Sequence, residues 1–206
     1  MFKDRQDAAN QLAEALEPYA GRNPLVLAIP RGAVPMARTI AGKLGGEFDV
    51  VLVRKLRAPC QPEFAIGSID ENGWAYIAPH ALAMDIDAGY LAQEKSRQLE
   101  TVRRRRAQYT PVRAPIDPAG RIVIVVDDGL ATGATMIAAL HGLKNHRPAE
   151  LVCAVPVAPA DSLEKIRALG VETVCLEVPL YFQSVGQFYE SFPQVEDEEV
   201  VALLAG

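Results

Sequence analysis

The stretch VVDDGLATGAT, residues 125–135, places Asp127 and Asp128 directly after an apolar run and follows them with two glycines and two threonines. The run RIVIVV, residues 121–126, predicts a buried strand, and residues 133–144 predict a helix. A glycine-containing turn at a helix N-terminus leaves backbone N–H groups available to an anion, and the helix dipole adds positive potential there. A plain turn in which Thr132 or Thr135 caps the helix is the alternative. Two acids closing an apolar strand favour a site that holds a phosphate and hydroxyl groups together.

Short apolar strands alternate with helices along most of the chain. Strands are expected at 24–30, 48–54, 121–126, 150–155 and 171–176, and helices at 4–19, 34–44, 133–144, 161–168 and 196–204. Continuous apolar strands that alternate with helices predict an α/β fold whose central sheet is mostly parallel and flanked by helices. Ligands of such sheets bind beyond the carboxyl ends of the strands.

Two features interrupt this alternation. The segments PEFAIGSI and WAYIAP flank the turn sequence at 70–73 and predict a hairpin, and residues 86–108 predict a long, strongly charged helix. We expect the hairpin and the helix to form an arm inserted at about 63–112. The length of 206 residues fits a single domain, 1–206.

Two further loops carry basic residues at expected strand ends. The loop IPRGAVP, residues 29–35, contains Arg31 and Gly32, and the segment beginning VRKLR at residue 53 contains Arg54, Lys55 and Arg57. Each can be an exposed turn or a solvated strand end. Because three such loops meet at one edge of a parallel sheet, binding of a polyanion is the better interpretation.

The stretch at 125–135 closely resembles the phosphoribosyl pyrophosphate motif of type I phosphoribosyltransferases, which has four apolar residues, two acids, two variable residues and then A/D-T-G-x-T. The segments RGAVPMA, VRKL…PEFAIG and VGQFYESF…DEEV are similar to an uncharacterised branch of that family. The resemblance covers nearly the whole chain. It implies the type I phosphoribosyltransferase fold, with the irregular aromatic tail at about 179–195 as a small hood.

The resemblance also implies a role for each candidate residue. The donor, phosphoribosyl pyrophosphate, places its ribose hydroxyls at Asp127 and Asp128, which also steady the cationic sugar during catalysis. The 5′-phosphate is expected at Ala131, Thr132, Gly133, Ala134 and Thr135, and the pyrophosphate at Arg31, Gly32, Arg54 and Lys55.

Two expectations rest on individual members of the family. The matching loop often has a cis peptide before its basic residue, which predicts a cis Pro30–Arg31 bond. The segment after Lys55 resembles the mobile loop of adenine phosphoribosyltransferase, where a glutamate on the returning strand assists acid–base chemistry. Glu63 lies in a comparable place, and an exposed loop carboxylate is the equal alternative.

The expected reaction transfers the 5-phosphoribosyl group to a nitrogen acceptor and releases pyrophosphate. Mg²⁺ is the expected cofactor, held by the substrate and reached by Asp127 and Asp128 through water. Ala131 stands where enzymes for hypoxanthine and guanine place an aspartate, which argues against oxopurines handled in that way. A protein that senses the donor or a nucleotide without turnover is the main alternative.

Composition limits the kinds of binding partner and the cell compartment that we expect for this protein. The net charge of −5 disfavours a nucleic-acid surface, and no apolar stretch approaches the ~18 residues that span a membrane. Three widely spaced cysteines and a charged N-terminus favour the cytoplasm. A homodimer stays an open alternative.

Overall fold

The structure is a computed structural model and describes residues 1–109, 111–112 and 114–206, excluding the side chains of Pro62 and Glu63. Its main sheet has five strands in the order β2-β1-β6-β7-β8, and every neighbouring pair is parallel. The strands are β1 (Leu25–Ala28), β2 (Glu47–Val50), β6 (Ile122–Val126), β7 (Glu150–Val157) and β8 (Glu172–Glu177). The predicted central parallel sheet is therefore confirmed, and β6 is its middle strand.

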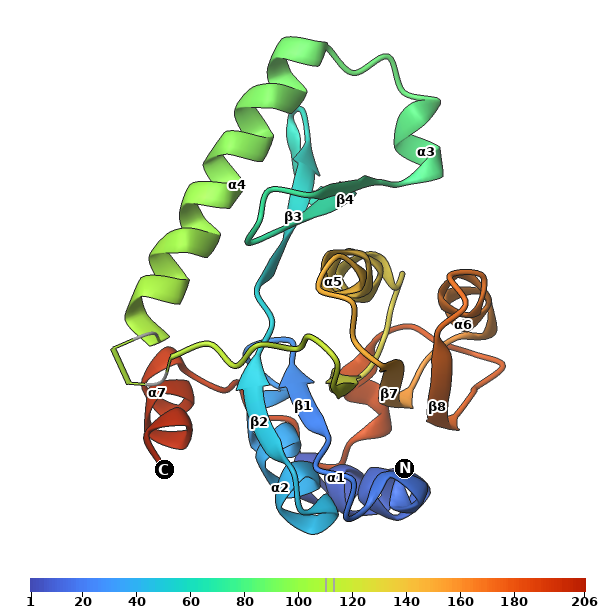
Figure 1. The fold of residues 1–206 in the computed structure, drawn as a ribbon. Helices are drawn as coiled ribbons and strands as arrows, with labels where there is room; N and C mark the ends of the chain where they lie inside the picture. The colour runs from blue at the N-terminus through green and yellow to red at the C-terminus, as the bar shows by residue number, and fades with distance from the viewer. Residues whose placement is uncertain (110, 113) are drawn as a thin grey trace.

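Helices cover both faces of this sheet, as Figure 1 shows. The helices α1 (Arg5–Ala15) and α2 (Val34–Leu44) cover one face, and α5 (Ala134–Lys144) and α6 (Ala160–Arg167) cover the other. Each face has its own apolar core. Along β6, Ile124 and Val126 belong to the core under α1 and α2, whereas Val123 and Val125 belong to the core under α5 and α6. Because successive strand residues face opposite sides, an unbroken apolar strand supplies both cores at once.

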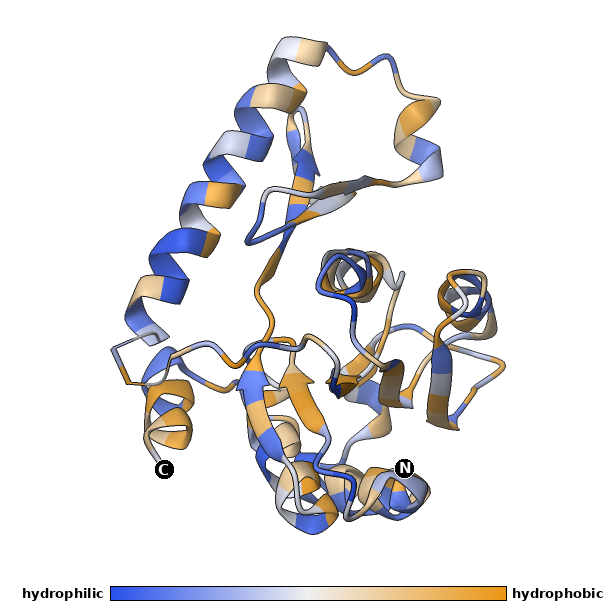
Figure 2. Cartoon of the chain, viewed as in Figure 1, coloured by the Kyte–Doolittle hydropathy of each residue, from blue (hydrophilic) through white to orange (hydrophobic). Residues whose placement is uncertain are grey.

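A second, antiparallel sheet and a long helix form the arm, which we define as residues 53–109. It contains β3 (Val53–Ala58), β4 (Gln61–Asp70), β5 (Ala75–Ile77), α3 (Pro79–Leu82) and α4 (Ala88–Tyr109). The predicted hairpin is confirmed as β4 and β5, and the predicted long helix as α4. The arm has its own small apolar cluster, centred on Leu56, Ile66 and Ile69. Figure 2 shows that α4 is largely hydrophilic along its length.

The prediction of one strand at 48–54 is wrong, because two strands share this range. The strand β2 ends at Val50, and Val53 already begins β3 in the other sheet. Residues 50–53 are all apolar, so no turn residue marks the point where the chain leaves the main sheet. In consequence Arg54, Lys55 and Arg57 lie within a strand of the arm and do not form a loop at the edge of the main sheet.

The expected helix at 4–19 divides in two. Asp4 caps α1 by accepting a hydrogen bond from the Asp7 N–H at 2.8 Å, and the short helix η1 (Glu17–Tyr19) follows, with Pro18 in its first turn. Proline is tolerated at the start of a helix and not in its interior, so the chain begins a new turn there.

The C-terminal tail returns to the N-terminus. It contains η2 (Val185–Phe188) and α7 (Asp197–Ala205), and residues 178–184 are irregular, as predicted. The Phe2 N–H donates to the Phe188 carbonyl at 2.8 Å, and the Glu190 N–H donates to the Phe2 carbonyl at 2.9 Å. The tail is thereby held next to the start of α1. Within the described part of the chain, no helix combines the length and apolar character needed to cross a bilayer.

Candidate active site

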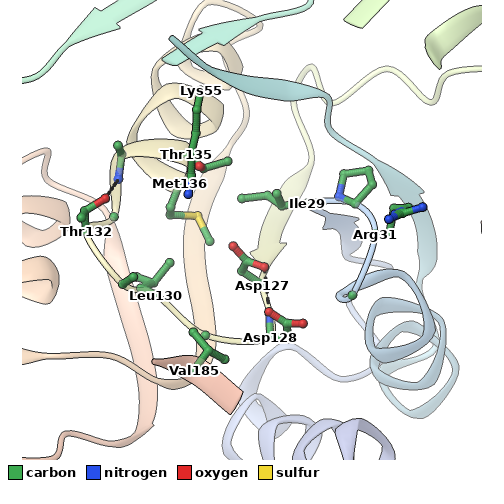
Figure 3. A pocket seen from close by; sticks show the side chains of 16 residues that line it. Ile29, Arg31, Lys55, Asp127, Asp128, Leu130, Thr132, Thr135, Met136 and Val185 are labelled. Atoms are coloured by element: carbon green, nitrogen blue, oxygen red, sulfur yellow. Dashed lines mark hydrogen bonds between the residues drawn. The ribbon is translucent and has the colours of Figure 1, made fainter. Parts of the chain in front are cut away.

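A pocket of about 300 Å³ lies at the carboxyl end of β6. Residues from four separate segments line it: Ile29, Pro30, Arg31, Gly32, Lys55, residues 127–136 and Val185. Figure 3 shows Asp127 and Asp128 on one side of this pocket and Thr132, Thr135 and Lys55 on the other. The structure therefore brings together all of the predicted 5′-phosphate and ribose residues and most of the predicted pyrophosphate residues.

The loop before α5 has the backbone of an anion cradle. Gly133 precedes the helix with φ +76°, a left-handed conformation that glycine adopts without steric cost. Among the described residues, none accepts a hydrogen bond from the backbone N–H of Thr132, Gly133 or Thr135. Free N–H groups at a helix N-terminus attract a phosphate.

Two serines outside the loop donate hydrogen bonds to its backbone carbonyl groups. The Ser162 hydroxyl donates to the Ala131 carbonyl at 2.6 Å, and the buried Ser68 hydroxyl of β4 donates to the Ala134 carbonyl at 2.8 Å. Both bonds take up carbonyl oxygens and leave the N–H groups available. The arm therefore supports the cradle directly, which the sequence alone did not reveal.

The surroundings of Asp127 and Asp128 disfavour the charged forms of both carboxyl groups. The Asp128 N–H donates to Asp127 Oδ1 at 2.9 Å. Burial, followed by the charge of Asp128, raises the pKa of Asp127 well above its ordinary range. Burial also raises the pKa of Asp128, and Arg5 opposes that shift. A ligand that brings hydrogen-bond donors or a cation to these carboxylates would stabilise their charged forms and lower their pKa values.

Arg5 of α1 is a site residue that the sequence analysis missed. Its Nε donates to Asp128 Oδ2 at 2.9 Å, and its Nη2 lies 2.9 Å from the same oxygen. Its Nη1 donates to the Pro193 carbonyl at 2.6 Å, and its guanidinium lies 3.8 Å from the centroid of the Phe192 ring. The Tyr189 hydroxyl adds a bond to the Asp128 carbonyl at 2.7 Å. The N-terminal helix and the tail thus fix Asp128 together, a long-range contact without a local sequence signal.

The loop at 29–35 packs closely against Asp128. A Cβ atom at Gly32 would lie 2.0 Å from Asp128 Oδ2, so a larger residue would fit here only if the Asp128 carboxylate moved. The Pro30–Arg31 peptide is cis, which confirms the expectation. The Arg31 guanidinium is turned toward α7, where its Nη1 donates to Glu196 Oε2 at 3.0 Å and lies 3.8 Å from Asp197 Oδ2. In Figure 3 it points away from the two aspartates.

The remaining predicted site residues do not all line the same pocket. Lys55 lines the pocket beside Thr135, whereas Arg54 lines only an adjoining pocket. The backbone of Glu63 lies in β4, but its side chain is outside the described residues, so the structure does not test its role. No group of three or more potential metal-ligating side chains occurs among the residues that the structure describes.

A parallel sheet with a phosphate cradle and paired carboxylates at its middle strand is the architecture of a phosphoribosyltransferase. The model of the phosphoribosyl transferase domain family matches residues 2–190, and the chain belongs to that family.

Two relatives resemble most of the chain. A protein of Thermus thermophilus, TT1426, has a crystal structure that is similar with a TM-score of 0.85, at 46% identity over 99% of this chain and 97% of that one. The Mycobacterium tuberculosis (strain ATCC 25618 / H37Rv) protein named "Putative phosphoribosyl transferase Rv0571c" is 40% identical over 205 residues, which is 99% of this chain and 46% of that protein. The chain therefore spans about half the length of this curated relative.

Proposed function

We propose that the chain transfers the 5-phosphoribosyl group of phosphoribosyl pyrophosphate to a nitrogen acceptor and releases pyrophosphate. The observation that carries the proposal is one pocket lined both by the 131–135 loop, with its free N–H groups, and by the two half-buried carboxylates of Asp127 and Asp128. A phosphate fits the first group and ribose hydroxyls fit the second.

In this proposal the protein contributes positioning and electrostatics. The cradle binds the 5′-phosphate and Asp127 and Asp128 accept hydrogen bonds from the ribose hydroxyls, so C1 of the ribose is held in one place. As pyrophosphate leaves, positive charge develops at C1, close to the two carboxylates. The proposal assigns the charge that develops on the leaving group to the Gly32 N–H and to the cations Arg31, Arg54 and Lys55.

The chemistry of the donor set fits Mg²⁺. Carboxylate oxygens are hard ligands, and Mg²⁺ keeps several waters and prefers phosphate oxygens of its substrate. Asp127 and Asp128 would hold the ion through water, and their raised pKa values indicate that nearby positive charge would be favourable. Bound there with the donor, the ion supplies charge neutralisation to the pyrophosphate.

The acceptor is expected beside Val185, because this residue of η2 lines the pocket from the tail. The proposal assigns Glu63 to proton transfer at the acceptor. A Glu63→Gln variant should then lower turnover and leave the affinity for the donor unchanged.

Calorimetry and a pyrophosphate-release assay test the proposal. We expect phosphoribosyl pyrophosphate to bind in the presence of Mg²⁺ and pyrophosphate to appear with at least one base in a panel of nucleobases. Thr135→Leu should abolish donor binding because the larger apolar side chain blocks the cradle, and Thr101→Leu on the arm is the matched control. Donor binding without release across the panel would support a sensor instead of an enzyme.

A further inference from the structure

A separate cavity of about 210 Å³ lies where the arm meets the main sheet, and we call it the joint cavity. The arm lines it with Glu71, Asn72 and Arg106, the end of α5 with Leu143 and His146, and strands β1 and β2 and the connection before β6 complete its wall. None of the described residues that line the joint cavity also lines the pocket of the aspartate pair. It is therefore a second place at which a small molecule could bind.

The inner wall of the joint cavity is apolar. Leu27, Val51 and Leu143 are buried members of the core under α5 and α6, and Ile116 packs against the same core. Sites for small organic ligands are typically apolar with a few well-placed polar groups, and they often lie between structural units. Because sites for drug-sized ligands hold roughly 300–1,000 Å³, this smaller cavity fits a molecule of one or two rings.

The charged groups of the joint cavity disfavour an anion. The Arg106 guanidinium donates to Glu71 at 2.8 Å through Nε and Nη2, and its Nη1 lies 4.0 Å from Asp49 Oδ1. The second oxygen of Asp49, Oδ2, accepts a hydrogen bond from the Ile116 N–H at 2.9 Å. Two carboxylates around one guanidinium leave a net negative charge, which would repel a phosphate or a carboxylate. An uncharged ligand avoids that repulsion.

Two polar side chains at the rim are available to such a ligand. Asn72 lies in the turn between β4 and β5, His146 follows the end of α5, and both are exposed residues that line the cavity. Among the described residues, none forms a hydrogen bond with the Asn72 amide or the His146 imidazole. An amide presents a donor and an acceptor side by side, which match the paired donor and acceptor on the edge of a nitrogen heterocycle.

We propose that the joint cavity binds an uncharged nitrogen heterocycle of one or two rings, which acts as an effector of the arm. A ligand there contacts the arm, the main sheet and α5 at once, so it holds the arm against the sheet. In that position the Ser68 hydroxyl of β4 supports the 131–135 loop through the Ala134 carbonyl. The effector and the phosphoribosyl donor therefore favour the same arrangement, and each raises the affinity for the other by the same factor. The effector role rests on the proposed function, whereas binding in the cavity does not.

The probe for the test is 9-methyladenine. It is an uncharged heterocycle of two rings, and a methyl group blocks its N9, so that this nitrogen cannot accept a phosphoribosyl group. Trp74 is the single tryptophan of the chain and lies two residues beyond Asn72, and its ring stacks on His141 of α5 with 4.4 Å between the ring centroids. We expect one probe to bind per chain in calorimetry, with a change in the fluorescence of Trp74.

Substitutions at the rim locate the bound probe. Asn72→Ala and His146→Ala should each weaken probe binding about fivefold, as expected for one lost hydrogen bond between neutral groups. Both positions are exposed, so the variants should fold. The matched control is Asn145→Ala, which removes an exposed amide next to His146 but outside the cavity, and it should bind the probe with unaltered affinity. Equal affinity in all three variants, or binding without a change in Trp74 fluorescence, would overturn the site.

The effector role is tested by titrating phosphoribosyl pyrophosphate and Mg²⁺ with and without saturating probe. We expect the probe to tighten donor binding about fivefold and the donor to tighten probe binding equally. Unchanged donor affinity would overturn the effector role. If the donor does not bind to the unaltered protein at all, the proposed function fails, and the comparison of the three variants without donor still decides whether the joint cavity binds the probe.

Discussion

At the scale of single residues, Arg5 explains how one carboxylate of the pair keeps its orientation. We predict that Arg5→Gln lowers the affinity for phosphoribosyl pyrophosphate about tenfold or more, since a charge-assisted hydrogen bond contributes about 1.5–3 kcal/mol. Arg5→Lys should not restore binding, because an ammonium cannot bind Asp128 and the Pro193 carbonyl with one rigid fork. Calorimetry with Arg38→Gln as control measures the effect, and full affinity in the lysine variant would contradict it.

The raised pKa of Asp127 has a cost in stability. The folded protein holds this proton to higher pH than the unfolded chain, so stability falls as pH rises from the unfolded value of 3.8 through the raised folded value. Asp127→Asn removes that loss and can keep the acceptor for the Asp128 N–H. We predict a variant more stable than the unaltered protein by on the order of 1 kcal/mol at about pH 7.

Urea unfolding at several pH values measures this difference. The gain should shrink as the pH is lowered toward 3.8, whereas donor binding should be lost at every pH. The exposed Asp85→Asn is the control. A variant less stable than the unaltered protein near neutral pH would show that the pair is stabilising.

At the scale of elements, we infer that α7 competes with bound pyrophosphate for Arg31. Glu196 and Asp197 start this helix and pair with the Arg31 guanidinium, which otherwise adjoins the pocket. We predict that Glu196→Gln tightens pyrophosphate binding by a factor of about three, the size of a partly exposed ion pair. Glu198→Gln, on the same helix without an ion pair among the described residues, is the matched control in the same titration. Weaker pyrophosphate binding in Glu196→Gln would contradict the competition.

Elements with local signals were predictable from the sequence. The helix α2 was expected at 34–44 and was found at those bounds, because a proline at its start and Gly45 at its end mark both boundaries. The aspartate pair and the 131–135 loop were placed correctly because strand, acids, glycines and helix follow one another directly.

Contacts between distant segments were not predictable. The bend after Val50 falls inside an apolar run, so the sequence does not reveal β3, the first strand of the arm. The pairing of Arg5 with Asp128 joins residues 123 apart in the chain. The sequence marks residues 86–108 only as a strongly charged helix and does not reveal that Glu94 is buried, because a carboxylate that accepts from the distant Arg57 N–H leaves no pattern in the sequence.

At the scale of the whole molecule, Arg106 joins the arm to the main sheet. Its guanidinium donates to Glu71 at 2.8 Å through Nε and Nη2 and to the Val50 carbonyl at 3.1 Å. The arm has its own apolar cluster, so it can open without unfolding the sheet.

We predict that Arg106→Met speeds hydrogen exchange of β3 and β4 about thirtyfold, which corresponds to about 2 kcal/mol for the lost charge-assisted bonds. Amides of β1 and β6 should be unaffected, as should all amides in the exposed control Arg103→Met. Because Ser68 of the arm supports the 131–135 loop, donor affinity should fall together with arm protection. Equal acceleration in both sheets would show that arm and core unfold as one unit.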